Sequence, residues 1–513
     1  MPVVGQTVSN LSDLPGRAAQ LWGEKCAVIA GENSWTFKEI DFAVQSAAAG
    51  LRDHGLRSGD VLTLYGENSW AWIIAYFAAL RMGAVINPVN SMNSADELLF
   101  ITADCRSRMV IASNKCLPNV PVEQIVIPFE PDGTHKSSIV ELASQRRQMT
   151  LPTTADDVAA ICYTSGTTGR PKGAVLTHAG ILTNVAMTSL MHGRSASDVI
   201  YSALPLPHVY GNVVMNTAFL AGASLVLSEK FDAENCLRSI QQHQITMVEG
   251  VPTMYYSLLE QNIIPGEVQS LRICTVGGQS MPAPKMAEIE KRFGCPLIEL
   301  WGMTELGGLG TTHPHTGPYR HGSIGTAMPF VETRIAAGTT SVDEAEIGAA
   351  GELLVRGHIV MRGYLNNEQA TGEAIDTGGW LRTGDIAIKD SGGYLRIVDR
   401  KTDMILSGGF NIYPAEIERV LADHPMVAMS AVAPAYDELK GEIAVAFVVP
   451  RGTTVLSPAD LMKHCRERLA VYKVPKTFRI VDDLPKTSTG KILRRALRDP
   501  QLDHYNILKG KCL

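Results

Sequence analysis

Short apolar strands alternate with amphipathic helices along more than half of this chain, and this alternation limits its possible folds most. The segments, read as strand, helix and strand in turn, are 61–64, 69–82, 84–88, then 199–203, 213–220, 224–227, 233–243 and 246–250. Because parallel strands need a helical crossover, such alternation is typical of parallel sheets covered by helices on both faces. The pattern predicts an α/β fold whose ligands bind beyond the carboxyl ends of the strands.

The second part of the chain has a different pattern. After about Ile324 the segments become glycine-rich and alternate in polarity, as in Gly351–Gly357 and Gly393–Val398, which predicts antiparallel strands of a barrel-like subdomain. Beyond Thr402, short strands mix with helices expected at 414–424 and 458–470. We therefore expect sheet subdomains over about 1–323, a barrel-like subdomain over about 324–400, and a C-terminal domain over 401–513.

Composition excludes several classes of protein. The chain has 513 residues, a net charge of −6 and nine cysteines without a CxxC pair. This charge gives no bulk attraction to nucleic acid or to a membrane surface, and the cysteines are typical of reduced thiols. The N-terminus lacks a basic start with an apolar core, and segment 69–82 is too short to cross a bilayer. We therefore expect a cytoplasmic protein with no membrane segment and no nucleic-acid partner.

A loop rich in glycine and hydroxyl side chains follows the predicted strand Val158–Cys162. Such a loop folds tightly with inward N–H groups, and its lysine adds charge, so it suits the phosphates of a nucleotide. It is not a Walker A loop, because Pro171 precedes the lysine. A flexible surface loop is the alternative. The candidate phosphate-binding residues are Thr164, Ser165, Gly166, Thr167, Thr168, Gly169 and Lys172.

Six motifs in order make the whole chain resemble the adenylate-forming superfamily, which includes acyl-CoA synthetases. They are 164–173, 204–211 (LPLPHVYG), 301–305 (WGMTE), 380–385 (WLRTGD), 399–409 (DRKTDMILSGG) and 485–491 (PKTSTGK). The resemblance implies a large N-terminal domain of two doubly wound sheets plus a distorted β-barrel, with a small mobile α+β C-terminal domain. It also implies a reaction in two halves. A carboxylic acid reacts with ATP, with Mg²⁺ present, to give acyl-AMP and pyrophosphate, and a thiol such as that of coenzyme A then displaces AMP.

The resemblance assigns roles to residues of the nucleotide site. Lys491 matches the adenylation lysine, whose compact charge can bridge two anions; Glu305 matches the magnesium ligand, with a second oxygen from Thr164. Asp385 and Arg400 would bind the ribose. The remaining assigned residues are Trp301, stacking on adenine in place of the usual tyrosine, Thr304, on the α-phosphate, and Gly278, Glu299, Gly302, Met303 and Ile397. Gln279 stands where relatives usually have a small residue, and its two alternative roles are a hydrogen bond to adenine and a narrowing of the acyl channel. A surface lysine, a structural Asp–Arg pair and a core tryptophan are the alternatives.

The second half-reaction implies a moving C-terminal domain. The matching hinge position is Thr402, where relatives commonly have aspartate or lysine, and loop residues of many kinds absorb such a rotation. Coenzyme A would pass the segment of Ser407, Gly408, Gly409 and Phe410, where glycines leave room for a pantetheine arm. A plain tight turn is the alternative there.

The acyl pocket is expected to be mainly apolar. His208 would orient the carboxylate or gate the pocket, although a structural histidine is the common alternative. Gly302 stands where acetate-specific relatives have tryptophan, and Leu300 where malonate-specific relatives have arginine. We therefore expect a monocarboxylic acid larger than acetate, with an aliphatic, aromatic or polycyclic body. The expected lining is His208, Val209, Tyr210, Val251, Met254, Gly277, Gly302, Met303 and Leu309.

The leading hypothesis is an AMP-forming acyl-CoA synthetase. An enzyme that loads an acyl group onto a carrier protein is the main alternative, and a luciferase-like oxygenase shares the first half-reaction. A non-catalytic AMP-binding regulator is disfavoured because Lys491, Glu305, Asp385 and Arg400 are all present. The assembly, a monomer or a homodimer, is left open.

Overall fold

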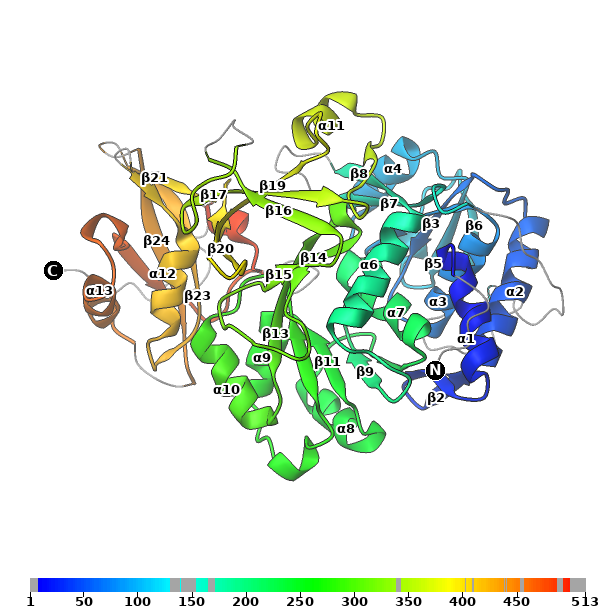
Figure 1. Ribbon diagram of the computed structural model, residues 1–513, viewed down its shortest axis with the longest axis horizontal. Helices are drawn as coiled ribbons and strands as arrows, with labels where there is room; N and C mark the ends of the chain where they lie inside the picture. Colours follow the sequence, from blue (N-terminus) through cyan, green and yellow to red (C-terminus); the bar gives the residue numbers. More distant parts are fainter. Residues whose placement is uncertain are drawn as a thin grey trace.

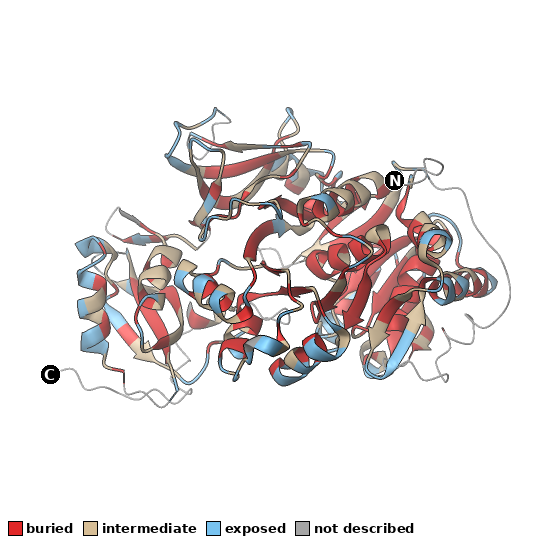
Figure 2. Ribbon diagram, turned by 60° about the horizontal axis from the view of Figure 1, so that its bottom comes forward, coloured by how far each residue is buried: buried red, intermediate tan, exposed pale blue. Residues whose placement is uncertain are grey.

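The computed structural model describes residues 8–129, 139, 154–164, 171–337, 343–401, 403–407, 410–437, 439, 441–452, 456–486 and 492–498. Figure 1 shows helix-covered sheets at the N-terminal end of the molecule and a smaller C-terminal unit at the other end. Figure 2 shows that the strands of the large sheets are mostly buried, while exposed residues lie on the outer helices and loops. The predicted α/β fold class is confirmed.

The largest sheet has nine strands in the order β15-β14-β13-β12-β11-β9-β10-β1-β2. Its six central strands are parallel, and antiparallel strands close both edges. The strands are β1 (Cys26–Ala30), β2 (Asn33–Thr36), β9 (Val199–Ser202), β10 (Ser224–Leu227), β11 (Met247–Gly250), β12 (Ile273–Val276), β13 (Leu297–Met303), β14 (Gly308–Thr312) and β15 (Thr326–Ala327).

A second sheet has seven strands in the order β18-β8-β7-β4-β3-β5-β6. Strands β7, β4, β3, β5 and β6 pair in parallel, whereas β8 and β18 are antiparallel additions. The strands are β3 (Val61–Tyr65), β4 (Val85–Val89), β5 (Met109–Ser113), β6 (Ile125–Phe129), β7 (Val158–Thr164), β8 (Lys172–Thr177) and β18 (Gly363–Tyr364).

Helices pack against these two sheets. They are α1 (Leu14–Trp22), α2 (Phe37–Asp53), α3 (Trp70–Arg81), α4 (Ala95–Asp104), α6 (His178–Met191), α7 (Val209–Ala221), α8 (Ala233–His243), α9 (Pro252–Leu259) and α10 (Ala283–Phe293). The predicted helix at 69–82 is confirmed as α3. Ser69 caps this helix, because its side-chain oxygen accepts a hydrogen bond from the Trp72 N–H. All of its residues are buried, and none of the described helices is long and apolar enough to cross a membrane.

Helix α7 begins four residues before the predicted start at Val213. The His208 ring accepts a hydrogen bond from the Tyr210 N–H and caps the helix, which allows the earlier start. Gly211 in the first turn has a packing reason, because a Cβ there would lie 2.4 Å from the Pro205 carbonyl oxygen. Because glycine disfavours a helix interior, the sequence pattern placed the start of the helix after Gly211.

The barrel-like subdomain is a curled sheet of four antiparallel strands. They are β16 (Val331–Ile335), β17 (Ala350–Gly357), β19 (Leu381–Lys389) and β20 (Leu395–Arg400), with α11 (Glu368–Ala374) before β19. One buried cluster takes in residues from Leu11 to Leu395, so this sheet shares the core of the large sheets.

The C-terminal unit has its own core, formed between Ile405 and Phe478. Its strands are β21 (Ile405–Ser407), β22 (Phe410–Ile412), β23 (Val427–Asp437), β24 (Gly441–Pro450) and β25 (Thr477–Ile480), and its helices are α12 (Pro414–Ala422) and α13 (Pro458–Arg466). This separate core fits the expected small α+β unit.

Candidate active site

The candidate site lies where several strands of the nine-stranded sheet end. Strands β9, β11, β12 and β13 are parallel neighbours, so their carboxyl ends share one edge. The segments with His208, Val251, Gly277 and Thr304 follow these strands directly. The fold therefore brings two of the six motifs, 204–211 and 301–305, and two further segments to the edge at which ligands of parallel sheets bind.

The phosphate-loop prediction falls largely outside the described residues, which exclude Ser165, Gly166, Thr167, Thr168 and Gly169. Its two flanks are described, and Thr164 on β7 pairs directly with Lys172 on β8. The Lys172 ammonium lies 5.2 Å from the centre of the Tyr364 ring, a distance that permits a cation–π contact. The loop is thus anchored on two adjacent antiparallel strands.

Glu305 is a buried carboxylate that forms no ion pair with any residue described by the structure. It lies on the 3₁₀ turn Thr304–Leu306, and its Oε1 accepts a 2.8 Å hydrogen bond from the Tyr364 hydroxyl. Burial raises the pKa of Glu305, and within the described part of the chain it forms no ion pair. A hard cation delivered with phosphate would relieve this cost of burial, so the site fits Mg²⁺.

No group of three or more His, Cys, Asp or Glu side chains that could hold a metal ion occurs among the described residues. A cage made by protein alone is therefore not supported there. Magnesium that shares its ligands with nucleotide phosphates needs only one or two carboxylates, a requirement that the buried Glu305 would fit.

Asp385 and Arg400 lie directly opposite each other on β19 and β20. The Arg400 Nε is 3.4 Å from the Asp385 Oδ1, and the Arg400 side chain is 63% exposed whereas that of Asp385 is 11% exposed. A third residue joins them, because the Trp301 indole N–H donates a 2.7 Å hydrogen bond to the Asp385 Oδ2. The sequence analysis did not find this indole–carboxylate contact.

Glu299 and Gln279 lie near the C-terminal unit. Glu299 is buried, which raises its pKa to about 8; the Met281 N–H lies 3.3 Å from Oε1, and Oε2 has no partner among the described groups. The Gln279 side-chain amide donates to the Ile492 carbonyl oxygen at 3.4 Å. Gly278 has a φ of +85°, which favours glycine, and Ile397 is half-buried on β20. Gln279 therefore contacts the chain directly after Lys491, which lies outside the described residues.

The expected acyl pocket ends in a buried polar network. The Tyr210 hydroxyl lies 2.5 Å from the Thr275 Oγ1 and donates to the Glu249 Oε2 at 3.2 Å. Glu249 in turn meets the Arg194 guanidinium at 2.6 Å, and both of these side chains have no exposed surface. Burial raises the pKa of Tyr210 well above its usual value. The sequence analysis expected an apolar lining and missed Arg194, Glu249 and Thr275.

Two glycines of the expected pocket have no space for a side chain. A Cβ at Gly302 would lie 2.0 Å from the Gly308 carbonyl oxygen on the neighbouring strand, and one at Gly277 would lie 2.3 Å from the Leu300 Cδ1. A bulky residue at position 302 would therefore require β13 and β14 to shift. Of the other residues expected to line the pocket, Val209 and Leu309 are buried and Met303 is half-buried.

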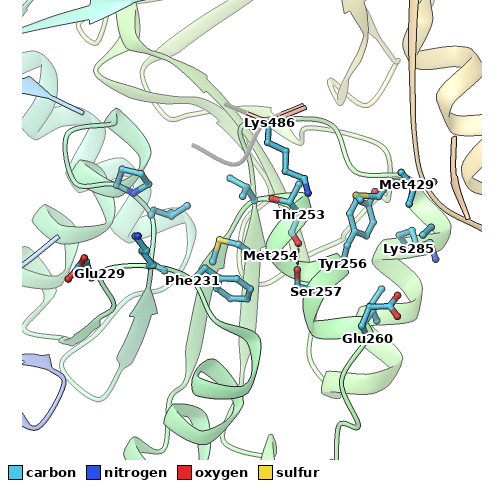
Figure 3. A pocket seen from close by; sticks show the side chains of 18 of the residues that line it. Glu229, Phe231, Thr253, Met254, Tyr256, Ser257, Glu260, Lys285, Met429 and Lys486 are labelled. Carbon is cyan, nitrogen blue, oxygen red and sulfur yellow. Dashed lines mark hydrogen bonds between the residues drawn. The ribbon is translucent and has the colours of Figure 1, made fainter. Parts of the chain in front are cut away.

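A cavity of about 780 Å³ lies between the strand ends and the C-terminal unit. It includes Val251 and Met254 of the expected acyl pocket, but its lining does not include Glu305, Trp301 or Asp385. Figure 3 shows Met254, Tyr256 and Ser257 from α9 at this cavity together with Met429 and Lys486 from the C-terminal unit. The cavity therefore does not enclose these three residues of the proposed nucleotide site.

The segments proposed for coenzyme A and for the hinge are only partly described. Ser407 is buried at the end of β21, Phe410 begins β22, and Gly408, Gly409 and Thr402 lie outside the described residues. Arg494 lies 3.3 Å from Asp403, 2.5 Å from Glu418 and 3.8 Å from Asp399. An arginine that follows Lys491 in the sequence thus bridges both sides of the proposed hinge.

Comparison with known proteins places the chain in a family. A family model described as "AMP-binding enzyme" matches residues 16–365, and one described as "AMP-binding enzyme C-terminal domain" matches residues 416–491. The chain belongs to the AMP-binding enzyme family. The superfamily resemblance stated from the motifs is confirmed.

Relatives of this AMP-binding enzyme cover nearly its full length. The 2-succinylbenzoate–CoA ligase of Bacillus subtilis (strain 168) is 33% identical over 94% of this chain and 96% of the relative. The indoleacetate–CoA ligase of Aromatoleum aromaticum is 33% identical over 95% and 98%. A crystal structure of ATP-bound MatB from Rhodopseudomonas palustris is 30% identical, covers 95% of this chain and 98% of that chain, and has a TM-score of 0.89. The predicted enzyme class, an acyl-CoA synthetase, is confirmed.

Proposed function

We propose that this AMP-binding enzyme activates a carboxylic acid larger than acetate as acyl-AMP and transfers the acyl group to coenzyme A. The observation that carries the proposal is the meeting of Trp301, Asp385 and Arg400 from three strands. This cluster gives a carboxylate and a guanidinium beside an aromatic ring, which are the groups that recognise a ribose and a base. Named relatives that act as CoA ligases support the same reaction class.

In the first half-reaction the acid's carboxylate oxygen bonds to the α-phosphorus of ATP, and pyrophosphate leaves. Two anions must approach, so the step needs positive charge and fixed geometry. We assign the charge to Lys491 and Lys172, and the binding of the α-phosphate to Thr304. Glu305 and Thr164 would hold Mg²⁺, which neutralises phosphate charge when bound.

In the second half-reaction the thiol sulfur of coenzyme A bonds to the acyl carbon, AMP leaves, and the thiol proton is released. We assign the approach of the pantetheine arm to Ser407, Gly408, Gly409 and Phe410, with rotation about Thr402. His208 caps α7 at the strand edge, which suits an orienting role toward the acid. The domain boundary after residue 400 belongs to the same proposal.

The acid that we propose has a compact apolar body. Val251 and Met254 offer apolar surface. The Arg194–Glu249 pair next to Tyr210 is fully buried, and separating it to make room for a substrate would cost a large free energy because two unpaired charges would remain buried. If this buried ion pair closes the end of the acyl pocket, the pocket favours aryl or cyclic acids over long-chain acids. The names of relatives include both kinds of acid, so our preference for a compact acid depends on the position of the Arg194–Glu249 pair.

The test is a panel of aryl, cyclic and straight-chain acids assayed for pyrophosphate release and for acyl-CoA by mass spectrometry, with and without coenzyme A. We expect acid-dependent release and an acyl-CoA product, with Asp385→Ala and Lys491→Ala as inactive controls. Formation of acyl-AMP without consumption of coenzyme A would instead favour loading of a carrier protein. Absence of release with every acid would contradict the proposal.

A further inference from the structure

Trp301 is held in one orientation by its surroundings. It lies on β13 opposite Thr311 of β14, and its side chain packs over Gly310, where a Cβ would come within 2.6 Å of the Trp301 Cζ3. The residue is 9% exposed. A ring confined in this way can direct its N–H group to only one place.

That place is the carboxylate of Asp385. The indole Nε1 is 2.7 Å from Oδ2, a short distance that is typical of a hydrogen bond to a charged acceptor. Asp385 is itself 7% exposed, and its backbone N–H donates to the Thr383 hydroxyl at 3.1 Å. Trp301 and Asp385 come from different sheets, so the contact depends on how the curled sheet packs against the nine-stranded sheet.

A second partner of this carboxylate, Arg400, is held less firmly. The Arg400 side chain is 63% exposed and approaches Oδ1 at 3.4 Å, so solvent weakens this pair. Of these two partners, the buried indole therefore constrains the direction of the carboxylate more firmly than the exposed guanidinium does. A neutral donor can orient a carboxylate without cancelling its charge, and so leaves it a strong acceptor for hydroxyl groups.

We propose that Trp301 is a positioning residue that orients Asp385 toward the ribose hydroxyls and thereby sets the preference for ribonucleotides over deoxyribonucleotides. This inference rests on the proposed function, in which Asp385 binds the ribose. It gives Trp301 a role in sugar recognition in addition to the expected contact with adenine.

The test measures equilibrium binding of ATP, 2′-deoxy-ATP and 3′-deoxy-ATP by calorimetry, using the full-length wild-type protein and Trp301→Phe. Phenylalanine keeps an aromatic face and removes the donor. We expect the affinity for ATP to fall about tenfold and that for each deoxynucleotide to fall much less, because the lost bond acts through the hydroxyl contacts. An unchanged ratio of ATP to deoxynucleotide affinity would overturn the inference, whether or not the absolute affinities fall.

The matched control is Trp380→Phe. Trp380 is 6% exposed in the same curled-sheet region, and its ring contacts the guanidinium groups of Arg334 and Arg356. The hydrogen bond that it donates to the Asp376 carboxylate comes from its backbone N–H, which phenylalanine retains. The same substitution there should leave the nucleotide ratio as in the wild type. A similar fall in the ratio would mean that any tryptophan loss in this region loosens the site, which would contradict a specific role of Trp301.

A second variant keeps the test decisive if Trp301→Phe does not fold correctly. Site-specific incorporation of 3-benzothienylalanine at position 301 replaces the N–H by sulfur and keeps the ring size. We expect it to reduce the nucleotide ratio as Trp301→Phe does, and to add nothing in an Asp385→Ala background. A wild-type ratio in the benzothienyl protein would refute the inference.

Different results would contradict the proposed function and the proposed role of Trp301. If the wild-type protein binds no ATP and shows no acid-dependent pyrophosphate exchange, the proposed function fails. If it binds ATP and the ratio is insensitive to the donor at position 301, only this inference fails.

Discussion

Two buried glutamates, Glu249 on β11 and Glu305 in the turn directly after β13, differ in their partners. Glu249, behind the expected acyl pocket, has no exposed side-chain surface and meets Arg194 at 2.6 Å. Glu305, in the nucleotide region, is also buried, but accepts a hydrogen bond from Tyr364 and forms no ion pair within the described ranges. The first carboxylate is neutralised by the fold, whereas the second retains a cost of burial that a ligand-borne cation would relieve.

The largest expected effect is the loss of the Arg194–Glu249 pair. In Arg194→Met, Glu249 becomes a buried charge without a cation, which should lower the free energy of unfolding by about 3–5 kcal/mol. Denaturant unfolding followed by fluorescence measures this change. The double variant Arg194→Met/Glu249→Leu should recover most of the loss, and a double variant as unstable as the single one would show that the pair is not the cause.

Glu305→Gln should produce the opposite result. Removal of a carboxylate whose pKa is raised by burial should leave the thermal stability unchanged or higher, while the rate of pyrophosphate exchange falls about 100-fold or more, an effect typical of a lost metal ligand. Melting curves and exchange assays measured side by side check both parts. A large loss of stability would place Glu305 with Glu249 as a structural residue.

Glu299 should give the protein a distinctive pH dependence. Burial raises its pKa to about 8 in the folded state, so between its ordinary pKa and pH 8 the folded protein binds one more proton than the unfolded chain. Its contribution to stability is therefore present at low pH and is lost as the pH rises toward 8. Between pH 6 and pH 8, the free energy of unfolding of the wild type should fall by about 2 kcal/mol more than that of Glu299→Gln, which has no carboxyl group to ionise at this position. Parallel stability curves for both proteins would contradict the raised pKa.

Tyr364→Phe should have the smallest effect. The Tyr364 hydroxyl donates to the charged form of Glu305, so its loss should weaken the site about five- to tenfold in the apparent affinity for Mg²⁺, with little change in stability. Titration of the exchange rate with Mg²⁺ measures this affinity. An unchanged Mg²⁺ requirement would mean that the tyrosine does not support the proposed ligand.

Much of the fold was predictable because its signals are local. The strands at 61–64 and 224–227 and the helix at 233–243 appear where apolar spacing predicted them, as β3, β10 and α8. The start of α7 was not predictable, since the cap is the ring of His208 and the first turn contains a glycine. The order of six motifs sufficed for the family, which the comparisons confirm.

The polar contacts of the site could not be predicted in the same way. Arg194 and Glu249 are 55 residues apart in the sequence, and Trp301 and Asp385 are 84 apart. Each pair forms only because neighbouring strands or sheets bring the side chains together. Tyr210, Trp301 and Asp385 were named as site residues from the sequence, and Asp385 was paired with Arg400, but no partner was predicted for the Tyr210 hydroxyl or for the Trp301 indole N–H.

The amino-acid sequence by itself determined the kinds of element, their alternation and the glycine- and hydroxyl-rich segments between them, because backbone preferences act over a few residues. Only the tertiary structure decided that Glu249 pairs with Arg194 whereas Glu305 forms no ion pair with a described residue, that Gly302 faces a carbonyl oxygen, and that Trp301 donates to Asp385. Charge, burial and hydrogen bonding depend on distances across strands, and these distances exist only once the sheets have packed.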